Sequence, residues 1–263
     1  MKRPIFQLDA FTDELFRGNS AAVVPLDEWL TDDILQKIAL ENMVPQTAFY
    51  VKSEEGFYIR WFTPAIELDL CGHATLAAAY VLMKYGGFEG DTINFGSKGG
   101  DLTVSKEPDG WFTLDFPVDV FQVAVPPPAL QESISPLTAL GVFRGKSDYM
   151  VVLETEAEVR DLEPDMIVLS TIPTRGIIVT AAGNEVDFVS RFFAPQSGID
   201  EDSVTGTAHT TLVPYWAQKL GKTEFVAKQL SLREGTLRCS LKEDRVFLSG
   251  QVREYLIGEI FIE

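Results

Sequence analysis

The chain has 263 residues but only two cysteines and two histidines. Cys71 and Cys239 are too few for a disulfide framework, which predicts a protein of a reducing compartment, the cytoplasm. Basic charge is also scarce: 22 Lys and Arg stand against 39 Asp and Glu, so the net charge is −17 and nucleic-acid binding is not expected. No apolar run approaches the roughly 18 residues of a membrane span, so no membrane segment is expected.

Several cofactor and catalytic motifs are missing as well. The sequence contains no Gly-x-Gly-x-x-Gly, no Gly-x-Ser-x-Gly and no His-Glu-x-x-His string. The segment from Gly141 to Ser147 resembles a phosphate loop but is one residue short between its glycines. These absences argue against a dinucleotide site, a hydrolase nucleophile and a zinc centre.

What the sequence does contain is a strand-rich pattern with a few helices. Thr31 to Asn42 has apolar residues on one face and predicts an amphipathic helix. His73 to Lys84 has no polar face, which predicts a helix buried on all sides. A third helix is expected from Thr207 to Leu220, closed by Gly221. The predicted strands are 4–10, 21–26, 47–52, 56–62, 92–96, 100–106, 111–117, 149–154, 176–182, 185–193, 229–233, 236–242, 245–250 and 258–263.

A run of three prolines, Pro126 to Pro128, divides this pattern. Three prolines cannot continue a helix or a central strand, so the segment is interpreted as a linker. Two domains are predicted, residues 1–122 and 123–263, and the last strand is free to return to the first domain.

The two halves repeat one another. Trp61-Phe62-Thr63-Pro64 precedes Gly72-His73-Ala74-Thr75, and Arg191-Phe192-Phe193-Ala194-Pro195 precedes Gly206-Thr207-Ala208-His209. In each half, a strand ending in Phe-x-Pro is followed by a loop and by a glycine that opens a helix. The pattern favours a duplication over chance.

The repeated helix starts are candidates for ligand binding. Gly72 and Gly206 would let an anion approach backbone N–H groups that have no partner within the helix, although both could simply form tight turns. His73 lies in a first turn, where it can reach a ligand, whereas His209 lies deeper in its helix and is interpreted as structural. Asp202 either faces a cleft or belongs to a solvated capping loop.

Cys71, beside Gly72, raises the question of a thiol acid/base. A two-cysteine mechanism would need a second thiol at the other helix start, but Cys239 falls in a predicted hairpin strand. Cys71 is therefore interpreted as a small buried residue.

Three longer strings, in the same order and spacing, resemble those of the PhzF-like (phenazine-biosynthesis-like) family. They are Asp9 to Thr12 with Phe16 to Val24, Arg60 to Pro64 with Glu67 and Leu70 to Ala77, and Ser190 to Pro195 with Glu201 to His209. The resemblance implies an α/β (α+β) fold like that of diaminopimelate epimerase. In that fold, two pseudo-symmetric domains each wrap a curved, mostly antiparallel sheet around a central helix.

The resemblance also implies a cofactor-free, commonly homodimeric isomerase that moves a proton on a small anionic substrate in the interdomain cleft. Carried over by motif, the catalytic positions are Gln46, His73, Asp202 and Thr207, and the substrate-binding positions are Asn19, Ser20, Gly72 and Gly206. Thr207 stands where well-studied relatives have serine.

One position departs from the family pattern. The string Pro45-Gln46-Thr47-Ala48-Phe49 has glutamine where the family has its acid/base glutamate, and an amide cannot carry a proton at pH 7. Gln46 is open to three interpretations: a deliberate substitution that traps ligand, a natural variant that uses another acid/base, or a catalytically silent binding protein.

Overall fold

The computed structural model describes residues 1–54 and 56–262, which form two compact units. Unit 1 comprises residues 1–115 and 249–263, and unit 2 comprises residues 116–248. The first boundary between the units thus lies between residues 115 and 116, before the 122/123 division expected from the sequence. Pro126 to Pro128 lie inside unit 2, where Pro128 begins helix α3 (Pro128–Ser133). Proline suits this first helical position because its missing N–H would have no helical partner there.

Unit 1 contains a mostly antiparallel sheet in the strand order β18, β1, β2, β3, β4, β6, β7, β8. The pairs β2–β3 and β4–β6 are parallel, and the short strand β5 pairs with β4. The strand bounds are β1 (Lys2–Ala10), β2 (Asn19–Pro25), β3 (Gln46–Ser53), β4 (Gly56–Phe62), β5 (Glu67–Leu68), β6 (Thr92–Gly96), β7 (Leu102–Lys106), β8 (Phe112–Pro117) and β18 (Val252–Phe261).

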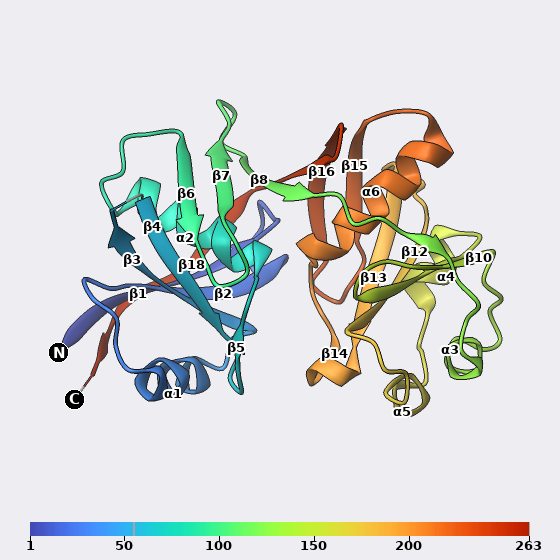
Figure 1. The fold of residues 1–263 in the computed structure, drawn as a ribbon, viewed down its shortest axis with the longest axis horizontal. Helices are drawn as coiled ribbons and strands as arrows, with labels where there is room; N and C mark the ends of the chain where they lie inside the picture. The colour runs from blue at the N-terminus through green and yellow to red at the C-terminus, as the bar shows by residue number, and fades with distance from the viewer. Residues whose placement is uncertain (55, 263) are drawn as a thin grey trace. The chain divides into compact units, whose positions relative to one another are not determined.

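Two helices pack on opposite faces of this sheet (Figure 1). Helix α2 (Gly72–Lys84) is buried along most of its length, which confirms the helix predicted to lack a polar face. Helix α1 (Asp32–Asn42) packs its Leu35 against Phe49 and Phe62. Because side chains alternate along a strand, Phe49 faces α1 while Gln46 and Ala48 face α2.

Unit 2 has the same kind of architecture around helix α6 (Gly206–Leu220), which contains Pro214 and ends at the left-handed Gly221. Its short helices are α4 (Glu156–Asp161) and α5 (Met166–Leu169), and η1 (Pro195–Ser197) is a 3-10 turn. The strand bounds are β9 (Gln122–Val123), β10 (Gly141–Arg144), β11 (Asp148–Val152), β12 (Gly176–Ala182), β13 (Phe188–Ala194), β14 (Ile199–Glu201), β15 (Glu224–Gln229), β16 (Gly235–Lys242) and β17 (Arg245–Gly250).

The structure tests two interpretations of the sequence in unit 2: a strand at 229–233 and a resemblance to a phosphate loop at 141–147. The strand predicted at 229–233 is wrong: β15 ends at Gln229, and Glu234 N donates to Ser231 O in a turn. The segment that resembled a phosphate loop forms β10 and the turn into β11, with Arg144 opposite Tyr149. A hairpin turn of this kind leads into no helix and lacks the cradle of a phosphate loop.

The predicted duplication is visible as a repeated ion pair. Arg60 on β4 pairs with both carboxylate oxygens of Glu67 (2.7 and 3.0 Å) and lies over the ring of Phe62. In unit 2, Arg191 on β13 pairs with both oxygens of Glu201 (2.7 and 2.9 Å) and lies over the ring of Phe193. The strand registers also agree, with Phe62 opposite Glu67 and Phe193 opposite Glu201.

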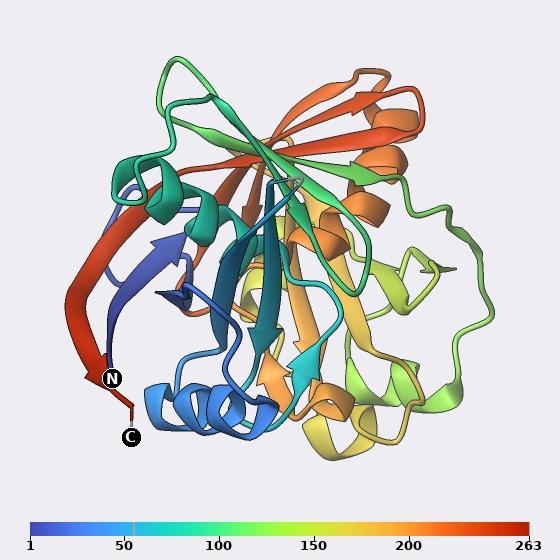
Figure 2. The ribbon, with the colours of Figure 1, turned by 60° about the vertical axis from the view of Figure 1, so that its left-hand side comes forward.

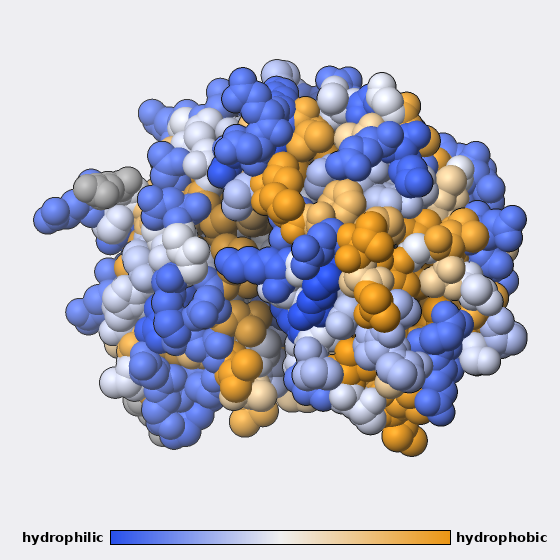
Figure 3. All heavy atoms as spheres, turned by 45° about the vertical axis from the view of Figure 1, so that its right-hand side comes forward, coloured by the Kyte–Doolittle hydropathy of each residue, from blue (hydrophilic) through white to orange (hydrophobic). Residues whose placement is uncertain are grey.

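Among the described residues, no helix is long and apolar enough to cross a membrane. The face in Figure 3 carries separate apolar patches among hydrophilic ones. In unit 2, large exposed apolar residues such as Val125, Ile167 and Leu232 come from loops and helices that are far apart in sequence.

Candidate functional site

Each unit presents one helix start built on the same plan. Counting from the paired glutamates, Cys71-Gly72-His73-Ala74-Thr75 corresponds without a gap to Thr205-Gly206-Thr207-Ala208-His209. In α2, Thr75 Oγ1 donates to the carbonyl of Cys71 at 2.5 Å. In α6, His209 Nδ1 donates to the carbonyl of Thr205 at 2.9 Å. His209 therefore corresponds to Thr75 and has the structural role expected for it, while Thr207 corresponds to His73.

The first turns of α2 and α6 contain no acidic side chain that would repel an anion. The residue before each helix, Cys71 or Thr205, makes no side-chain cap, and neither first turn contains an acidic residue. The first N–H groups of a helix have no partner within it, and the helix dipole adds positive potential there. Both starts can therefore hold a carboxylate or a developing oxyanion.

Gln46 lies at the start of β3, on the sheet face that α2 covers. Because Ala48 is opposite Trp61, Gln46 and Trp61 lie diagonally on this same face. The matching register makes Gly176 the counterpart of Gln46 in unit 2, where an added Cβ would lie 2.1 Å from the ring of Phe192, the counterpart of Trp61. In unit 2, the backbone of Gly176 therefore lies so close to the ring of Phe192 that a side chain at position 176 would clash with it.

Three polar atoms on this side of unit 1 are buried without a hydrogen-bond partner among the described residues: Gln46 Oε1, Trp61 Nε1 and His73 Nε2. A buried polar atom without a partner costs about 1–3 kcal/mol, so such groups generally indicate bound water or ligand. Trp61 was not singled out from the sequence, because its apolar strand context predicts a core residue. Its indole N–H, on a residue only 1% exposed, is the observation that adds it to the site.

His73 is buried, with 5% of its surface exposed. Burial lowers its pKa to about 3, and the backbone of Ser20 opposes this shift. The imidazole is thus neutral at pH 7. Its Nδ1 lies 3.6 Å from the Sγ of Cys71, which is buried as expected from the sequence.

The predicted binding residues Asn19 and Ser20 lie at the start of β2, opposite Ala10 and Asp9. Asn19 is fully buried and Ser20 is 8% exposed. Since Ala21 is next to Gln46 in the parallel β2–β3 pair, the structure brings Ser20, Gln46 and His73 to one end of α2.

In unit 2, Asp202 is tied to the start of α6. Its Oδ2 accepts from Thr205 Oγ1 at 2.6 Å. Gln229, fully buried on β15, fixes the backbone around this pair: its Oε1 accepts from Thr205 N (2.8 Å) and its Nε2 donates to the carbonyl of Asp202 (2.8 Å) and to Thr205 Oγ1 (3.1 Å). Gln229 is a positioning residue that the sequence did not reveal, because a glutamine at a strand end carries no motif.

Thr207 accepts a hydrogen bond from a cation. Arg175 Nη1 donates to Thr207 Oγ1 at 2.9 Å, and the same guanidinium grips both carboxylate oxygens of the buried Asp148. Burial lowers the pKa of Arg175, but the hydrogen bond and charge of Asp148 outweigh it, so the net pKa is raised and the cation is kept. The sequence did not reveal the pair of Arg175 and Asp148, because an arginine and an aspartate that lie 27 residues apart form no motif.

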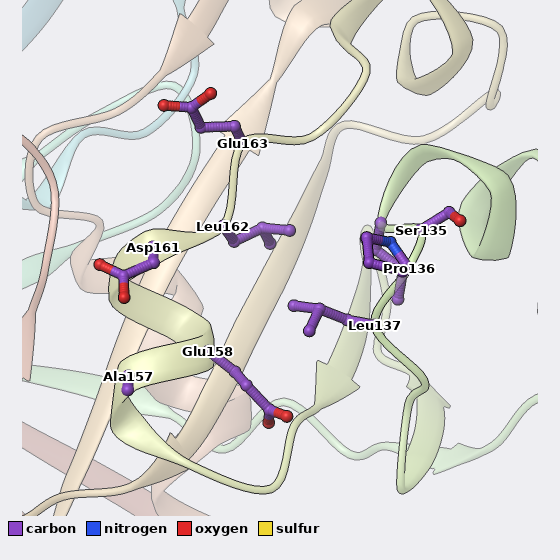
Figure 4. A pocket seen from close by; sticks show the side chains of 9 residues that line it. Ser135, Pro136, Leu137, Ala157, Glu158, Asp161, Leu162 and Glu163 are labelled. Carbon is purple, nitrogen blue, oxygen red and sulfur yellow. The ribbon is translucent and has the colours of Figure 1, made fainter.

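Unit 2 also carries a surface groove of about 420 Å³, lined by Ile134 to Leu137, Ala157, Glu158 and Asp161 to Glu163. In Figure 4, Leu137 and Leu162 point toward one another across it, whereas Asp161 and Glu163 point away. Glu158 caps α4 through the backbone of Thr155. None of the predicted site residues lines this groove, and no group of three or more metal-ligating side chains occurs within residues 1–54 and 56–262.

Comparison with known proteins shows which family the chain is similar to. Residues 8–253 match the phenazine biosynthesis-like protein family, PhzC-PhzF. An uncharacterized isomerase of Pseudomonas aeruginosa is 44% identical over 266 residues and covers 100% of both chains. A human phenazine biosynthesis-like domain-containing protein is 38% identical over 99% of both chains.

Among solved structures, a PhzF family protein of Enterococcus faecalis has a TM-score of 0.96 and 40% identity, with both chains fully covered. A hydroxyproline epimerase from Agrobacterium vitis, 10% identical, has a TM-score of 0.62 over 98% of this chain and 92% of its own, and shares the fold alone. These similarities confirm the predicted epimerase-like α/β fold.

Proposed function

The chain belongs to the phenazine biosynthesis-like protein family, and from this premise we propose that it is an isomerase that moves a proton on a small anionic metabolite without a cofactor. The observation that carries the proposal is the set of three unpartnered buried atoms, Gln46 Oε1, Trp61 Nε1 and His73 Nε2, beside the uncapped start of α2. Together they offer an acceptor, a donor and an imidazole nitrogen to one bound molecule.

The two helix starts supply the anion site of the proposal. The first turns of α2 and α6, beginning at Gly72 and Gly206, bind the substrate carboxylate and an oxyanion that develops when a proton leaves the adjacent carbon. Asn19 and Ser20 orient the substrate from β2. The family resemblance and the duplication support the proposal that both starts act on one substrate.

His73, held neutral by burial, acts first as a hydrogen-bonding group. An anion bound beside its Nε2 raises its pKa, because a nearby negative charge favours the imidazolium. His73 then becomes able to hold a proton in the complex although it does not in the free protein. Asp202 is the carboxylate of the proposed site, and Thr205 and Gln229 keep it in place.

Gln46 favours a second candidate function, a substrate-trapping or silent binding protein on the same fold. The amide keeps the shape of the family glutamate and removes its proton. A single experiment separates the two functions: transfer of deuterium from heavy water into a panel of small unsaturated and amino carboxylates, followed by mass spectrometry.

The isomerase proposal predicts deuterium transfer by the unchanged chain, and the binding proposal predicts ligand protection without transfer. Gln46→Glu is expected to raise the transfer rate about 100-fold or more, within the range for a positioned acid/base. Gln122→Glu, at an exposed position of unit 2, is the matched control. No gain in the Gln46→Glu protein on any substrate that the unchanged chain turns over would remove position 46 from the mechanism.

A double-mutant cycle tests whether the two units share a substrate. His73→Gln and Asp202→Asn should each slow transfer, and their combination should slow it by less than the product of the two effects if both groups act in one transition state. Full additivity would instead assign the two residues to separate steps or sites.

A further inference from the structure

Helix α6 begins beside a buried ion pair of unit 2. Figure 2 shows α6 in orange against the yellow and orange strands of this unit. Arg175 lies one residue before β12 and donates through Nη1 to Thr207 Oγ1 at 2.9 Å. Its Nε and Nη2 donate to the two carboxylate oxygens of Asp148, which is buried. A bidentate grip of this kind fixes the plane of the guanidinium, so Nη1 approaches Thr207 from one direction.

The hydroxyl of Thr207 is therefore restricted to one role. A hydroxyl offers one hydrogen and two lone pairs, whereas a guanidinium has donors only. Arg175 thus occupies a lone pair of Thr207 Oγ1 and cannot accept its hydrogen. No acceptor for that hydrogen lies within hydrogen-bond distance in residues 1–54 and 56–262, and Thr207 is only half-buried. The hydrogen is left to bond with a bound group or with water.

A second threonine of unit 2 shows how this fold satisfies such a hydroxyl. Thr174 Oγ1 also accepts from an arginine, through Nη1 of Arg144, and it donates to the carbonyl of Ser147 at 2.9 Å. Thr174 thus has an acceptor for its own hydrogen, whereas Thr207 has none in the described part of the chain. The contrast indicates that a group from outside the chain completes the hydrogen bonds of Thr207.

Arg175 also offsets the negative charge around this helix start. Burial lowers the pKa of Arg175, but neighbouring carboxylates raise it further, so the guanidinium stays charged. These carboxylates belong to Asp148, Asp202 and Asp119. Without the guanidinium, they would repel an anion from the first turn of α6. With it, the best acceptor for the Thr207 hydroxyl is an oxygen anion, because hydrogen bonds to ionised acceptors are about twice as strong as neutral ones.

We propose that Arg175, held by Asp148, is a positioning residue that makes the Thr207 hydroxyl an obligate donor to an ionised carboxylate of the substrate. Arg175 acts through Thr207 and thereby selects a carboxylate over a carboxamide at the start of α6. This role rests on the proposed function, in which this helix start binds an anionic substrate, but the binding of a carboxylate can be measured without turnover.

Titration of propionate and of propionamide into the full ¹⁵N-labelled chain tests this role. The backbone amide signals of Ala208 and Gly72 report binding at the two helix starts separately. Propionate is expected to shift the Ala208 signal to saturation, whereas propionamide, which has the same shape without the charge, is not. Thr207→Val should weaken propionate binding at this signal about tenfold or more, the size expected for one hydrogen bond to a charged group. Thr207→Ser keeps the hydroxyl and should restore the binding.

Arg175→Lys tests the positioning itself. Lysine keeps the charge but has a single nitrogen, which cannot grip both oxygens of Asp148 and also reach Thr207 in a fixed geometry. Propionate binding at Ala208 should weaken about tenfold, while binding at Gly72 stays unchanged. Because Arg175 acts through Thr207, adding Arg175→Lys to Thr207→Val should weaken binding little further.

Arg144→Lys is the matched control, because Arg144 also donates to a threonine of unit 2, one whose own hydrogen is already bonded to the backbone. It should leave propionate binding at Ala208 unchanged. Circular dichroism checks the fold of each variant, and Thr207→Val leaves the ion pair intact, so it decides the question even if Arg175→Lys does not fold.

Three results would overturn the assigned role: propionamide binding as tightly as propionate, unchanged propionate binding in Thr207→Val, or effects of Arg175→Lys and Thr207→Val that multiply. The last would mean that Arg175 contacts the anion directly. The proposed isomerase fails separately, if no carboxylate takes up deuterium although propionate binds at Ala208 with the expected dependence on Thr207 and Arg175.

Discussion

Replacing Gln229 by methionine should reveal how strongly unit 2 depends on one buried amide. Gln229 is fully buried and satisfies two backbone groups next to α6, the N–H of Thr205 and the carbonyl of Asp202. Methionine has similar volume and flexibility but neither donor nor acceptor, so the substitution removes the hydrogen bonds without opening a large cavity.

The magnitude follows from the exposure of the two orphaned groups. The N–H of Thr205 is buried, so its loss of a partner costs about 1–3 kcal/mol. Asp202 is only half-buried, so water can serve its carbonyl and the cost there is smaller. Together they predict that the free energy of unfolding falls by about 1–4 kcal/mol.

Urea denaturation followed by circular dichroism measures this loss, with Gln122→Met at an exposed position as the control. The control should change the free energy of unfolding by less than about 0.5 kcal/mol. A loss below about 1 kcal/mol in Gln229→Met, the lower end of the range for an orphaned buried group, would refute the reasoning. It would mean that the start of α6 rearranges to satisfy these groups by itself.

Two further predictions concern buried charge. Burial lowers the pKa of His209 to about 4, so between pH 6.5 and about 4 the unfolded chain binds a proton that the folded chain does not, and stability falls as the pH falls through this range. His209→Gln should flatten that part of the stability profile measured by urea denaturation, and an unchanged slope would contradict the assigned pKa. Arg175→Met leaves the carboxylate of Asp148 buried without its cation and should lower the unfolding free energy by roughly 1–4 kcal/mol, since Arg175 is partly exposed. Thermal unfolding should show partial recovery in Arg175→Met/Asp148→Leu, and no recovery would mean that the pair does not act as a unit.

The elements of the fold were largely predictable, because periodicity reports burial. The run of strand-forming residues from Thr47 to Lys52 and the all-apolar stretch after His73 located β3 and α2 within a residue or two. The division of the chain was misplaced because three prolines read equally well as a linker or as the entrance to a helix. Which of the two occurs depends on tertiary contacts that no local pattern contains.

The candidate site was predictable only where it follows a motif. Gln46, His73 and Asp202 were located by the strings around them, whereas Trp61, Gln229 and Arg175 were not. Trp61 looks like core until its N–H is found without a partner, and Gln229 and Arg175 act across 24 and 32 residues on Thr205 and Thr207. Such long-range hydrogen bonds leave no spacing in the sequence.

The two helix starts share one backbone plan but have diverged in charge. At α2, the side chains are uncharged at neutral pH: an amide at 46, an indole at 61 and an imidazole whose pKa is about 3. At α6, the carboxylate of Asp202 accepts from the hydroxyl of Thr205, and the guanidinium of Arg175 donates to the hydroxyl of Thr207. The same guanidinium pairs with the carboxylate of Asp148. In the free protein, these three side chains at the start of α2 are therefore uncharged, while the start of α6 holds fixed charges. In the proposed isomerase, the proton carrier is either Asp202 at α6 or His73 once a bound anion has raised its pKa. The double-mutant cycle between these two residues is thus also the test of how the chain works with Gln46 in place of a glutamate.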